Sequence, residues 1–100
     1  MDINITDGIQ TIITVKGRLD TVNAPDFEKT VTPIMTGEMK DTVIDCTGLD
    51  YISSSGLRQF LTLQKTANAK QVKLTLKGMK NEIKEIFDMT GFSSIFRIEE

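Results

Sequence analysis

Alternating apolar and polar residues predict β-strands in several parts of this chain. Residues 9–16 (Ile-Gln-Thr-Ile-Ile-Thr-Val-Lys) alternate over most of their length, as expected for a strand with one buried face. Residues 3–5 (Ile-Asn-Ile) predict a short strand before it, and the turn Asp7-Gly8 joins the two as an antiparallel hairpin. Further strands are predicted at 42–46, 72–76 and 95–98.

Three other segments carry apolar residues at helical spacing. The first follows Asn23, which is a polar cap, and continues with an early proline and an acidic residue; Phe27 and Val31 form its expected buried face. Pro33 predicts an interruption near its end. The second helix follows the serines at 53–55, and the third stops near Gly91. On these two helices we expect Leu57, Phe60, Leu61, Ala67, Met79, Ile83, Ile86 and Phe87 on the buried side, and Arg58, Gln59, Gln64 and Lys65 facing water.

Strands that alternate with helices indicate an α/β fold. One hundred residues are enough for one hydrophobic core, so we expect a single domain over residues 1–100. Its sheet should be mixed, with about four to five strands, parallel strands at the centre and helices packed on it. The turns at 17–20, 48–56 and 77–79 then emerge at one edge of the sheet and form one surface.

Composition narrows the choice of partners and compartment. The chain is 39% hydrophobic and 26% charged with a net charge of −2, which is ordinary for a globular protein and gives no basic tract for nucleic acid. No apolar run approaches the roughly 20 residues that cross a bilayer, and residues 1–4 do not look like a signal peptide. We therefore expect a cytoplasmic protein without direct membrane insertion. The lone Cys46 lies in a predicted strand, where a buried structural thiol is expected rather than a redox group.

The groups that usually carry catalysis are missing from the sequence. There is no histidine, which removes the common general base of a serine triad and the commonest metal ligand. The serines do not fit the Gly-x-Ser-x-Gly elbow, because Ile52 stands two residues before Ser54. No phosphate-binding or dinucleotide-binding glycine motif is present, and Asp45 and Asp50 do not form a calcium-loop pattern. We expect no enzyme activity, no cofactor and no metal ion.

Three consecutive serines stand directly before the second helical pattern. A helix start has unpaired N–H groups and the positive end of the dipole, so it accepts an anion well. A phosphate on one serine would add about −1.5 to −2 charge without breaking the fold, which suggests a reversible switch. The same serines also fit a purely structural role, because a hydroxyl cap stabilises a helix by about 1 kcal/mol relative to alanine.

Two neighbouring residues have open interpretations. Asp20 is expected at the same sheet edge as the serines, where its carboxylate either contacts a partner or bonds a loop amide. Gly56 either belongs to the site or permits close packing of the helix start.

The motifs together resemble a known family. Residues 44–57 (Ile-Asp-Cys-Thr-Gly-Leu-Asp-Tyr-Ile-Ser-Ser-Ser-Gly-Leu), preceded by Gly-Arg-Leu-Asp at 17–20 and followed by Ile-Phe-Asp-Met-Thr-Gly-Phe at 86–92, resemble the STAS domain of anti-sigma factor antagonists. The similarity covers essentially the whole chain.

The resemblance implies a function and its site residues. Such proteins bind an anti-sigma factor that is also a serine kinase, which frees a sigma factor for transcription. The kinase phosphorylates the antagonist, the modified form lets go, and a metal-dependent serine phosphatase restores it. Ser54 aligns with the phosphoacceptor, and the partner-binding residues implied are Asp20, Ser53, Ser54, Ser55, Gly56 and Arg58.

One position departs from the family pattern. The family often has aspartate immediately before the acceptor, whereas this chain has Ser53, which offers another candidate hydroxyl. Our first hypothesis is a regulator that binds the kinase while unphosphorylated and is switched off by phosphorylation at Ser54. The second is a STAS subunit of a lipid-transport or stress-signalling assembly that uses the same edge without phosphorylation; an enzyme ranks third.

Overall fold

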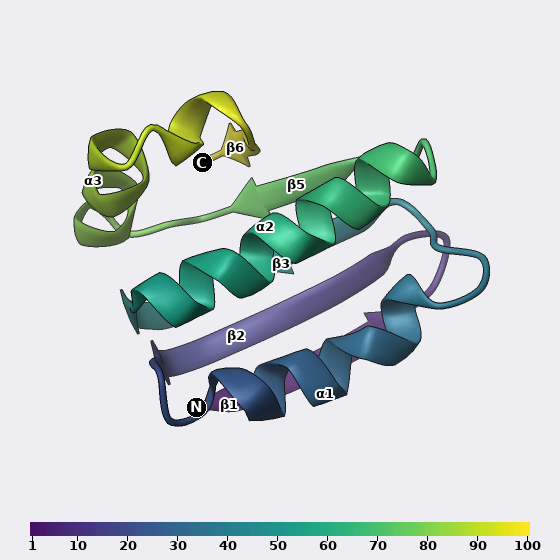
Figure 1. The fold of residues 1–100 in the computed structure, drawn as a ribbon, viewed down its shortest axis with the longest axis horizontal. Coiled ribbons are helices and arrows are strands. Elements are labelled where there is room, and N and C mark those ends of the chain that lie inside the picture. Colours follow the sequence, from purple (N-terminus) through teal and green to yellow (C-terminus); the bar gives the residue numbers. More distant parts are fainter.

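A six-stranded mixed sheet and three α-helices make up the computed structural model, which describes residues 1–100 (Figure 1). The expected α/β fold with a mixed sheet is therefore confirmed, and the sheet has one strand more than the largest number expected. In chain order the elements are β1 (Asp2–Asp7), β2 (Thr11–Leu19), α1 (Ala24–Met35), β3 (Thr42–Asp45), β4 (Leu49–Ile52), α2 (Ser54–Ala69), β5 (Leu74–Lys77), α3 (Asn81–Met89), the 3₁₀ turn η1 (Phe92–Ser94) and β6 (Arg97–Glu99).

The strands follow the order β1-β2-β3-β5-β6, and β4 lies off this path because it pairs only with β2. β1 and β2 form the predicted antiparallel hairpin, while β2, β3, β5 and β6 run parallel. β2 is long enough to have two neighbours on one side. Its residues 11–14 pair with β3, and its residues 17–19 pair with β4.

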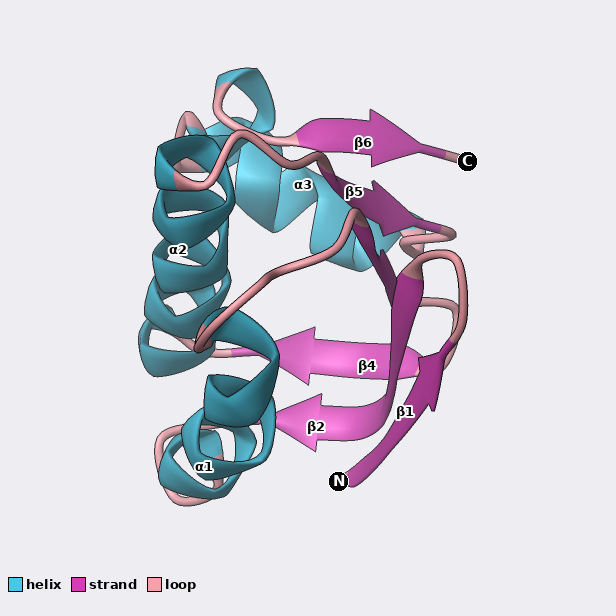
Figure 2. Cartoon of the chain, turned by 90° about the vertical axis from the view of Figure 1, so that its right-hand side faces the viewer, coloured by secondary structure: helices cyan, strands magenta, loops and turns pink.

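The helices cover one face of the sheet and close a single hydrophobic core. Figure 2 shows α1 and α2 side by side on that face. The strand residues Ile13, Ile44 and Leu76 are fully buried in this core. Three phenylalanines connect the helices: Phe27 of α1 lies 5.7 Å from Phe60 of α2, which lies 6.2 Å from Phe87 of α3, measured between ring centroids. Such ring contacts add to the burial energy and hold α2 in a fixed position on the sheet.

The expectations about Pro33 in α1 and Gln64 in α2 are wrong. α1 is not interrupted near Pro33, because this exposed proline stands in the last turn and the helix ends two residues later, where few backbone bonds remain to be broken. Gln64 does not face water: it is 8% exposed and its Nε2 donates to Asn68 Oδ1 at 3.0 Å. α2 packs against both the sheet and α1, so its buried stripe is wider than one narrow face and also includes Leu63.

The region between β3 and α2 also differs from the expectation. Residues 48–56 were expected to form a turn, but residues 49–52 form β4 beside the end of β2. β6 begins at Arg97, after a short 3₁₀ turn, and not at the expected residue 95.

Candidate functional site

The serines lie where β2, β4 and α2 meet. Leu19 at the end of β2 pairs with Ile52 at the end of β4, and the Ser53 N–H donates to the Leu19 carbonyl at 2.9 Å. Because the two strands are parallel, both end at the same edge of the sheet, and Asp20 and Ser53 continue from there. We call this region, residues 20–23 and 53–58, the serine edge.

Ser53 caps the second helix. It has extended backbone angles, its Oγ accepts a hydrogen bond from the Gly56 N–H at 3.2 Å, and only 9% of the residue is exposed. This is the usual geometry of an N-cap residue. The hydroxyl at the position of the family aspartate is thus buried and already bonded.

Ser54 and Ser55 have different surroundings. Ser54, the first residue of α2, is exposed, and its hydroxyl makes no hydrogen bond within the protein. Ser55 is half-buried and its Oγ donates to Thr21 Oγ1 at 3.4 Å, which connects α2 to the loop after β2. Of the three serines, only Ser54 offers a free hydroxyl to solvent.

Asp20 bonds loop amides rather than extending into solvent. Its Oδ1 accepts from the N–H groups of Val22 at 3.0 Å and Asn23 at 3.1 Å. In return, Asn23 Oδ1 accepts from the Asp20 N–H at 2.8 Å, so the two side chains form a reciprocal arrangement like a capping box. Asn23 therefore fixes the loop before α1. The prediction that its side chain caps α1 is wrong, because it makes no hydrogen bond to the first turn of that helix.

Gly56 is required by packing. A Cβ at this position would lie 2.8 Å from both Ile52 Cγ1 and Leu19 Cγ, closer than side-chain atoms approach. The glycine therefore lets the first turn of α2 lie against β2 and β4. It is buried and carries no side chain that a partner could contact.

Several surface residues beside the serines could not be assigned from the sequence. Val22 is 87% exposed at the tip of the rigid loop, and the Arg18 guanidinium lies 4.2 Å from the centre of the Tyr51 ring. Arg58 lines a hollow of about 170 Å³ between the starts of α1 and α2, together with Glu28 and Ser55. Exposed Tyr and Arg side chains are enriched in protein interfaces. Arg18 and Tyr51 are brought together by the pairing of β2 with β4. The sequence did not predict β4, so it could not predict this contact.

The three loops expected to share one surface meet only in part. Loops 17–20 and 48–56 lie together through the pairing of β2 with β4. Residues 77–79 adjoin the opposite end of β4, where a Cβ on Gly78 would lie 2.5 Å from Thr47 Oγ1. An ion pair between Lys80 and Asp50 ties this region to β4. The length of β4 therefore separates the Gly78 loop from Ser53.

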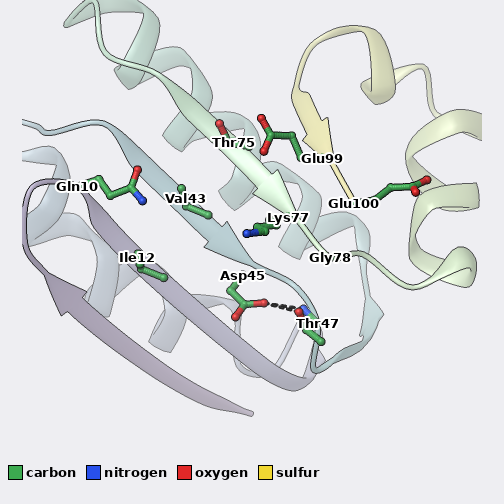
Figure 3. Close-up of a pocket in the computed structure, with 10 residues that line it drawn as sticks. All are labelled: Gln10, Ile12, Val43, Asp45, Thr47, Thr75, Lys77, Gly78, Glu99 and Glu100. Atoms are coloured by element: carbon green, nitrogen blue, oxygen red, sulfur yellow. Dashed lines mark hydrogen bonds between the residues drawn. The ribbon is translucent and has the colours of Figure 1, made fainter.

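The largest hollow of the surface lies away from the serine edge. It measures about 610 Å³ on the other face of the sheet, and Figure 3 shows the helices behind the strands that line it. Here Asp45 Oδ1 accepts from the Thr47 hydroxyl at 2.6 Å and from its N–H at 3.0 Å, and these bonds hold the pKa of Asp45 below its usual value. The lining residues are Gln10, Ile12, Val43, Asp45, Thr47, Thr75, Lys77, Gly78, Glu99 and Glu100.

Other features of the chain add no second reactive centre. Cys46 is fully buried, and burial raises the pKa of its thiol to about 12, so it is an unreactive structural residue at neutral pH. No group of three or more acidic or thiol side chains is arranged to hold a metal ion. None of the helices combines the length and apolarity needed to cross a bilayer.

Comparison with known proteins agrees with this geometry. The family model described as STAS domain matches residues 1–100. BtrV of Bordetella bronchiseptica, by name a candidate anti-sigma factor antagonist, is 33% identical over 87 residues, which are 87% of this chain and 75% of that protein. The solved anti-sigma factor antagonist (STAS) domain protein of Planctomyces limnophilus superposes with a TM-score of 0.90 at 19% identity, covering 100% of this chain and 91% of that chain.

A third relative has been solved in two covalent states. SpoIIAA, an anti-sigma factor antagonist described as a Bacillus cell fate determinant, has an unphosphorylated structure with a TM-score of 0.77 at 13% identity, covering 99% of this chain and 87% of that chain. Its phosphorylated structure gives 0.76 at 14% identity, covering 97% and 90%. At these identities the two structures establish the shared fold. From its sequence match over the whole length and its fold, the chain belongs to the STAS domain family, and its relatives include proteins named as anti-sigma factor antagonists.

Proposed function

We propose that this protein is an anti-sigma factor antagonist that binds an anti-sigma serine kinase through the serine edge and releases it when Ser54 is phosphorylated. The observation that carries the proposal is the exposed, unbonded Ser54 hydroxyl at the start of α2. The family membership and the names of the relatives support the same class of function.

The choice of Ser54 over its neighbours follows from access. A kinase must bring a hydroxyl oxygen in line with the γ-phosphate, which requires a side chain free to leave its surroundings. Ser53 would have to give up its bond to the Gly56 N–H and leave a buried position, and Ser55 would have to leave Thr21. Ser54 can react without disturbing either bond.

A phosphate at Ser54 would change the surface more than the fold. The first turn of α2 contains no acidic residue, so the helix dipole and the N–H groups that Ser53 does not bond can stabilise a dianion. A partner surface that fits a neutral hydroxyl would meet about −1.5 to −2 charge instead. Release requires that the partner binds the two forms with different affinity, and this charge supplies the difference.

The rest of the cycle follows from the same switch. The unphosphorylated form holds the kinase and frees a sigma factor, and a metal-dependent serine phosphatase removes the phosphate and restores binding. The antagonist itself needs no catalysis and no cofactor, and it acts in the cytoplasm, where the sigma factor and ATP are present. Asp20 and Ser53 act by holding the edge in shape, while Arg58 and Ser54 contact the partner.

The test uses the kinase-type anti-sigma factor of the same organism. The protein is incubated with this kinase, ATP and magnesium, and phosphopeptides are mapped by mass spectrometry. We expect one phosphate on Ser54, none in the Ser54→Ala variant, and unchanged phosphorylation in Ser55→Ala. An unmodified Ser54, under conditions in which the kinase modifies another antagonist, contradicts the proposal.

Ser53 is the observation that favours a second candidate function. Its neutral hydroxyl replaces an aspartate that the family often carries, and a kinase that reads this carboxylate would not accept the chain. The protein would then be a STAS subunit of a lipid-transport or stress-signalling assembly that uses the edge unmodified. In that case Ser54→Asp and Ser54→Ala would change partner binding equally, whereas the switch requires a much larger loss for Ser54→Asp.

A further inference from the structure

The first strand leaves a long edge of the sheet unpaired. β1 pairs with β2 in continuous register from Asp2 to Asp7 and has no second neighbour. Free edges are normally protected by bulges, prolines, central lysines or shortness. The opposite edge strand, β6, has only three residues, of which two are charged, whereas β1 has six residues with charges only at its two ends. Of these two outer strands, β1 is thus the longer and the less protected edge.

The hydrogen bonds of β2 determine which groups of β1 point outward. The Thr11 N–H donates to Asp41 O, and the Gly17 N–H donates to Gly48 O. The backbone N–H and C=O groups of odd-numbered residues of β2 therefore point toward β3 and β4. The backbone groups of even-numbered residues of β2 point toward β1, and the register pairs them with the even-numbered residues of β1. The N–H and C=O groups of Ile3 and Ile5 consequently point away from the sheet.

These outward groups are complementary to those of a second copy. Two β1 strands related by a two-fold axis at Asn4 place Ile3 opposite Ile5 of the other copy, so their four outward N–H groups meet four outward C=O groups. We infer that the chain forms a symmetric dimer in which two β1 strands pair antiparallel about Asn4. The two six-stranded sheets then join into one continuous sheet.

Side chains agree with this register on both faces. Ile3 and Ile5 lie on the helix side, half-buried at the edge of the core, and the dimer sets them against their counterparts. Ile5 also lines a groove of about 270 Å³ between β1 and α1, together with Pro33 and Ile34, and the Ile3 of the other copy covers the β1 side of that groove.

On the outer face the register brings polar groups together. The exposed Asn4 meets its own copy at the axis, where two amides can hydrogen-bond to each other. Asp2 meets Thr6 of the other copy, so a carboxylate faces a hydroxyl and no two carboxylates are directly opposed. Shifting the axis by one residue to Ile5 would set the Asp7 of one copy against Ile3 of the other, which buries a charge beside an apolar side chain.

The dimer leaves the serine edge free. β1 lies on one side of β2, whereas β4 and Ser53 lie on the other side. Because the axis makes the two β1 strands antiparallel, the two serine edges point to opposite ends of the joined sheet. Dimerisation therefore does not depend on phosphorylation, and its test is independent of the proposed function.

Two lysine substitutions give opposite predictions. Asn4→Lys sets two like charges against each other at the axis, so the dimer should weaken strongly. Thr6→Lys sets each new lysine against Asp2 of the other copy, so the dissociation constant should fall by about 2- to 30-fold, from two cross-strand charge pairs of ordinary strength. Both residues are exposed in the monomer, and both substitutions add the same charge to β1.

Sedimentation velocity over micromolar to millimolar concentrations measures the effect. We expect the wild type to dimerise within this range, Asn4→Lys to stay monomeric, and Thr6→Lys to dimerise more tightly, with an advantage that salt removes. A wild type that is monomeric at millimolar concentration overturns the inference. Equal weakening by both lysines overturns it too, because that result indicates a nonspecific edge contact.

A thiol at the axis provides a second test. In the dimer, Asn4→Cys places two thiols in a directly opposed, non-hydrogen-bonded pair, which oxidised glutathione should convert into a covalent dimer. Thr6→Cys faces Asp2 instead and is the matched control. Cys46 is buried and does not compete. Rapid crosslinking of Asn4→Cys alone supports the register, and equal crosslinking of the two variants contradicts it.

Discussion

The three serine side chains have different environments. Ser53 Oγ satisfies the Gly56 N–H, which has no other partner in the first turn of α2. Ser53→Ala should lower the free energy of unfolding by about 1 kcal/mol, measured by urea denaturation. Ser53→Asp keeps a cap acceptor and should be nearly neutral. Ser54→Ala, which removes no hydrogen bond, is the control and should leave stability unchanged.

Close packing at Gly56 can be tested with a single methyl group. Gly56→Ala would place Cβ 2.8 Å from Ile52 Cγ1 and Leu19 Cγ, so the helix start must move or the core must shift. Overpacking of this kind costs about 1–3 kcal/mol, more than alanine gains in helix propensity. Thermal unfolding should show a clear loss of stability. Gly8→Ala, where the nearest atom is Gln10 O at 3.8 Å, should be close to neutral.

The carboxylate of Asp45 makes stability depend on pH in acid. The Thr47 hydroxyl and N–H, bonded to this carboxylate, lower its pKa below the ordinary value of 3.8. A folded-state pKa below the unfolded value means that the contribution is complete above pH 3.8 and is lost as the pH falls through the folded value. Urea midpoints of Thr47→Ala should therefore lie below wild type near neutral pH and converge with it in acid. A difference that grows in acid contradicts this assignment.

At the residue scale, the sequence predicted the serine cap of the second helix but not the hydrogen bonds of the neighbouring loop. Three serines before a helix pattern indicated a cap and an anion-tolerant position, and both uses are consistent with the structure. The reciprocal hydrogen bonds between Asp20 and Asn23 could not be predicted from the sequence, because either side chain can cap a helix or bond a neighbouring amide. That choice depends on the path of the loop after β2.

At the scale of elements, α2 is the helix without a charge at its start. α1 and α3 carry Asp26 and Glu82 in their first turns, whereas α2 has no acidic residue there. Ser54→Asp should therefore stabilise the protein by about 0.3–1 kcal/mol at low salt, although we expect it to abolish kinase binding. Stability gained and binding lost would together exclude misfolding as the cause of lost binding.

The matched control for this effect is at the other end of α2. Ala69→Asp places the same charge at the last residue of the helix, near the negative end of the dipole, and should destabilise the protein. Urea denaturation at low and high salt measures both variants, and salt should reduce both effects. If the two substitutions have the same sign, the dipole does not explain the tolerance of charge at Ser54.

β4 shows why some elements escape a periodicity analysis. Leu49 and Ile52 are buried while Asp50 and Tyr51 are exposed, so the strand does not alternate. The register with β2 shifts between Gly17 and Arg18, and this irregularity lets two adjacent residues of β4 face outward. The sequence pattern predicted β3, β5 and the part of β2 that precedes this shift, where the pairing with β3 is regular. β4 pairs with one strand only and through an irregular register, so its sequence shows no alternation of apolar and polar residues.

For the whole molecule, the layered arrangement could be predicted and the site surface only in part. Alternating strand and helix patterns imply parallel strands, and parallel strands bring the ends of β2 and β4 to one edge. The contact between Arg18 and Tyr51 depends on the pairing of β2 with β4, which no local pattern encodes. The buried Gln64 has the same origin, since the contact between α1 and α2 is not visible in either helix alone.

The packing of the core leads us to expect that a charge at Ser54 changes the structure only near the serine edge. α2 is held by Phe60 between Phe27 and Phe87, and its first turn is fixed by the close approach at Gly56. A framework packed in this way resists gradual deformation. In amide NMR spectra of Ser54→Glu, we expect shifts confined to the serine edge, with β5 and β6 unchanged. Gly56→Ala, which displaces the helix start, should spread its effects further.

A wider response would mean a different kind of switch. If Ser54→Glu shifted the amides of β5 and β6 as strongly as those of the serine edge, the charge would be moving α2 on the sheet. Release of a partner would then follow from a change in shape, and variants that loosen the contact between Phe60 and Phe87 should release it without any charge at Ser54. With a rigid core, Phe60→Leu should lower stability, as unfolding experiments would show, while binding to the kinase is retained. Measuring binding and unfolding for this one variant therefore separates a surface switch from a conformational one.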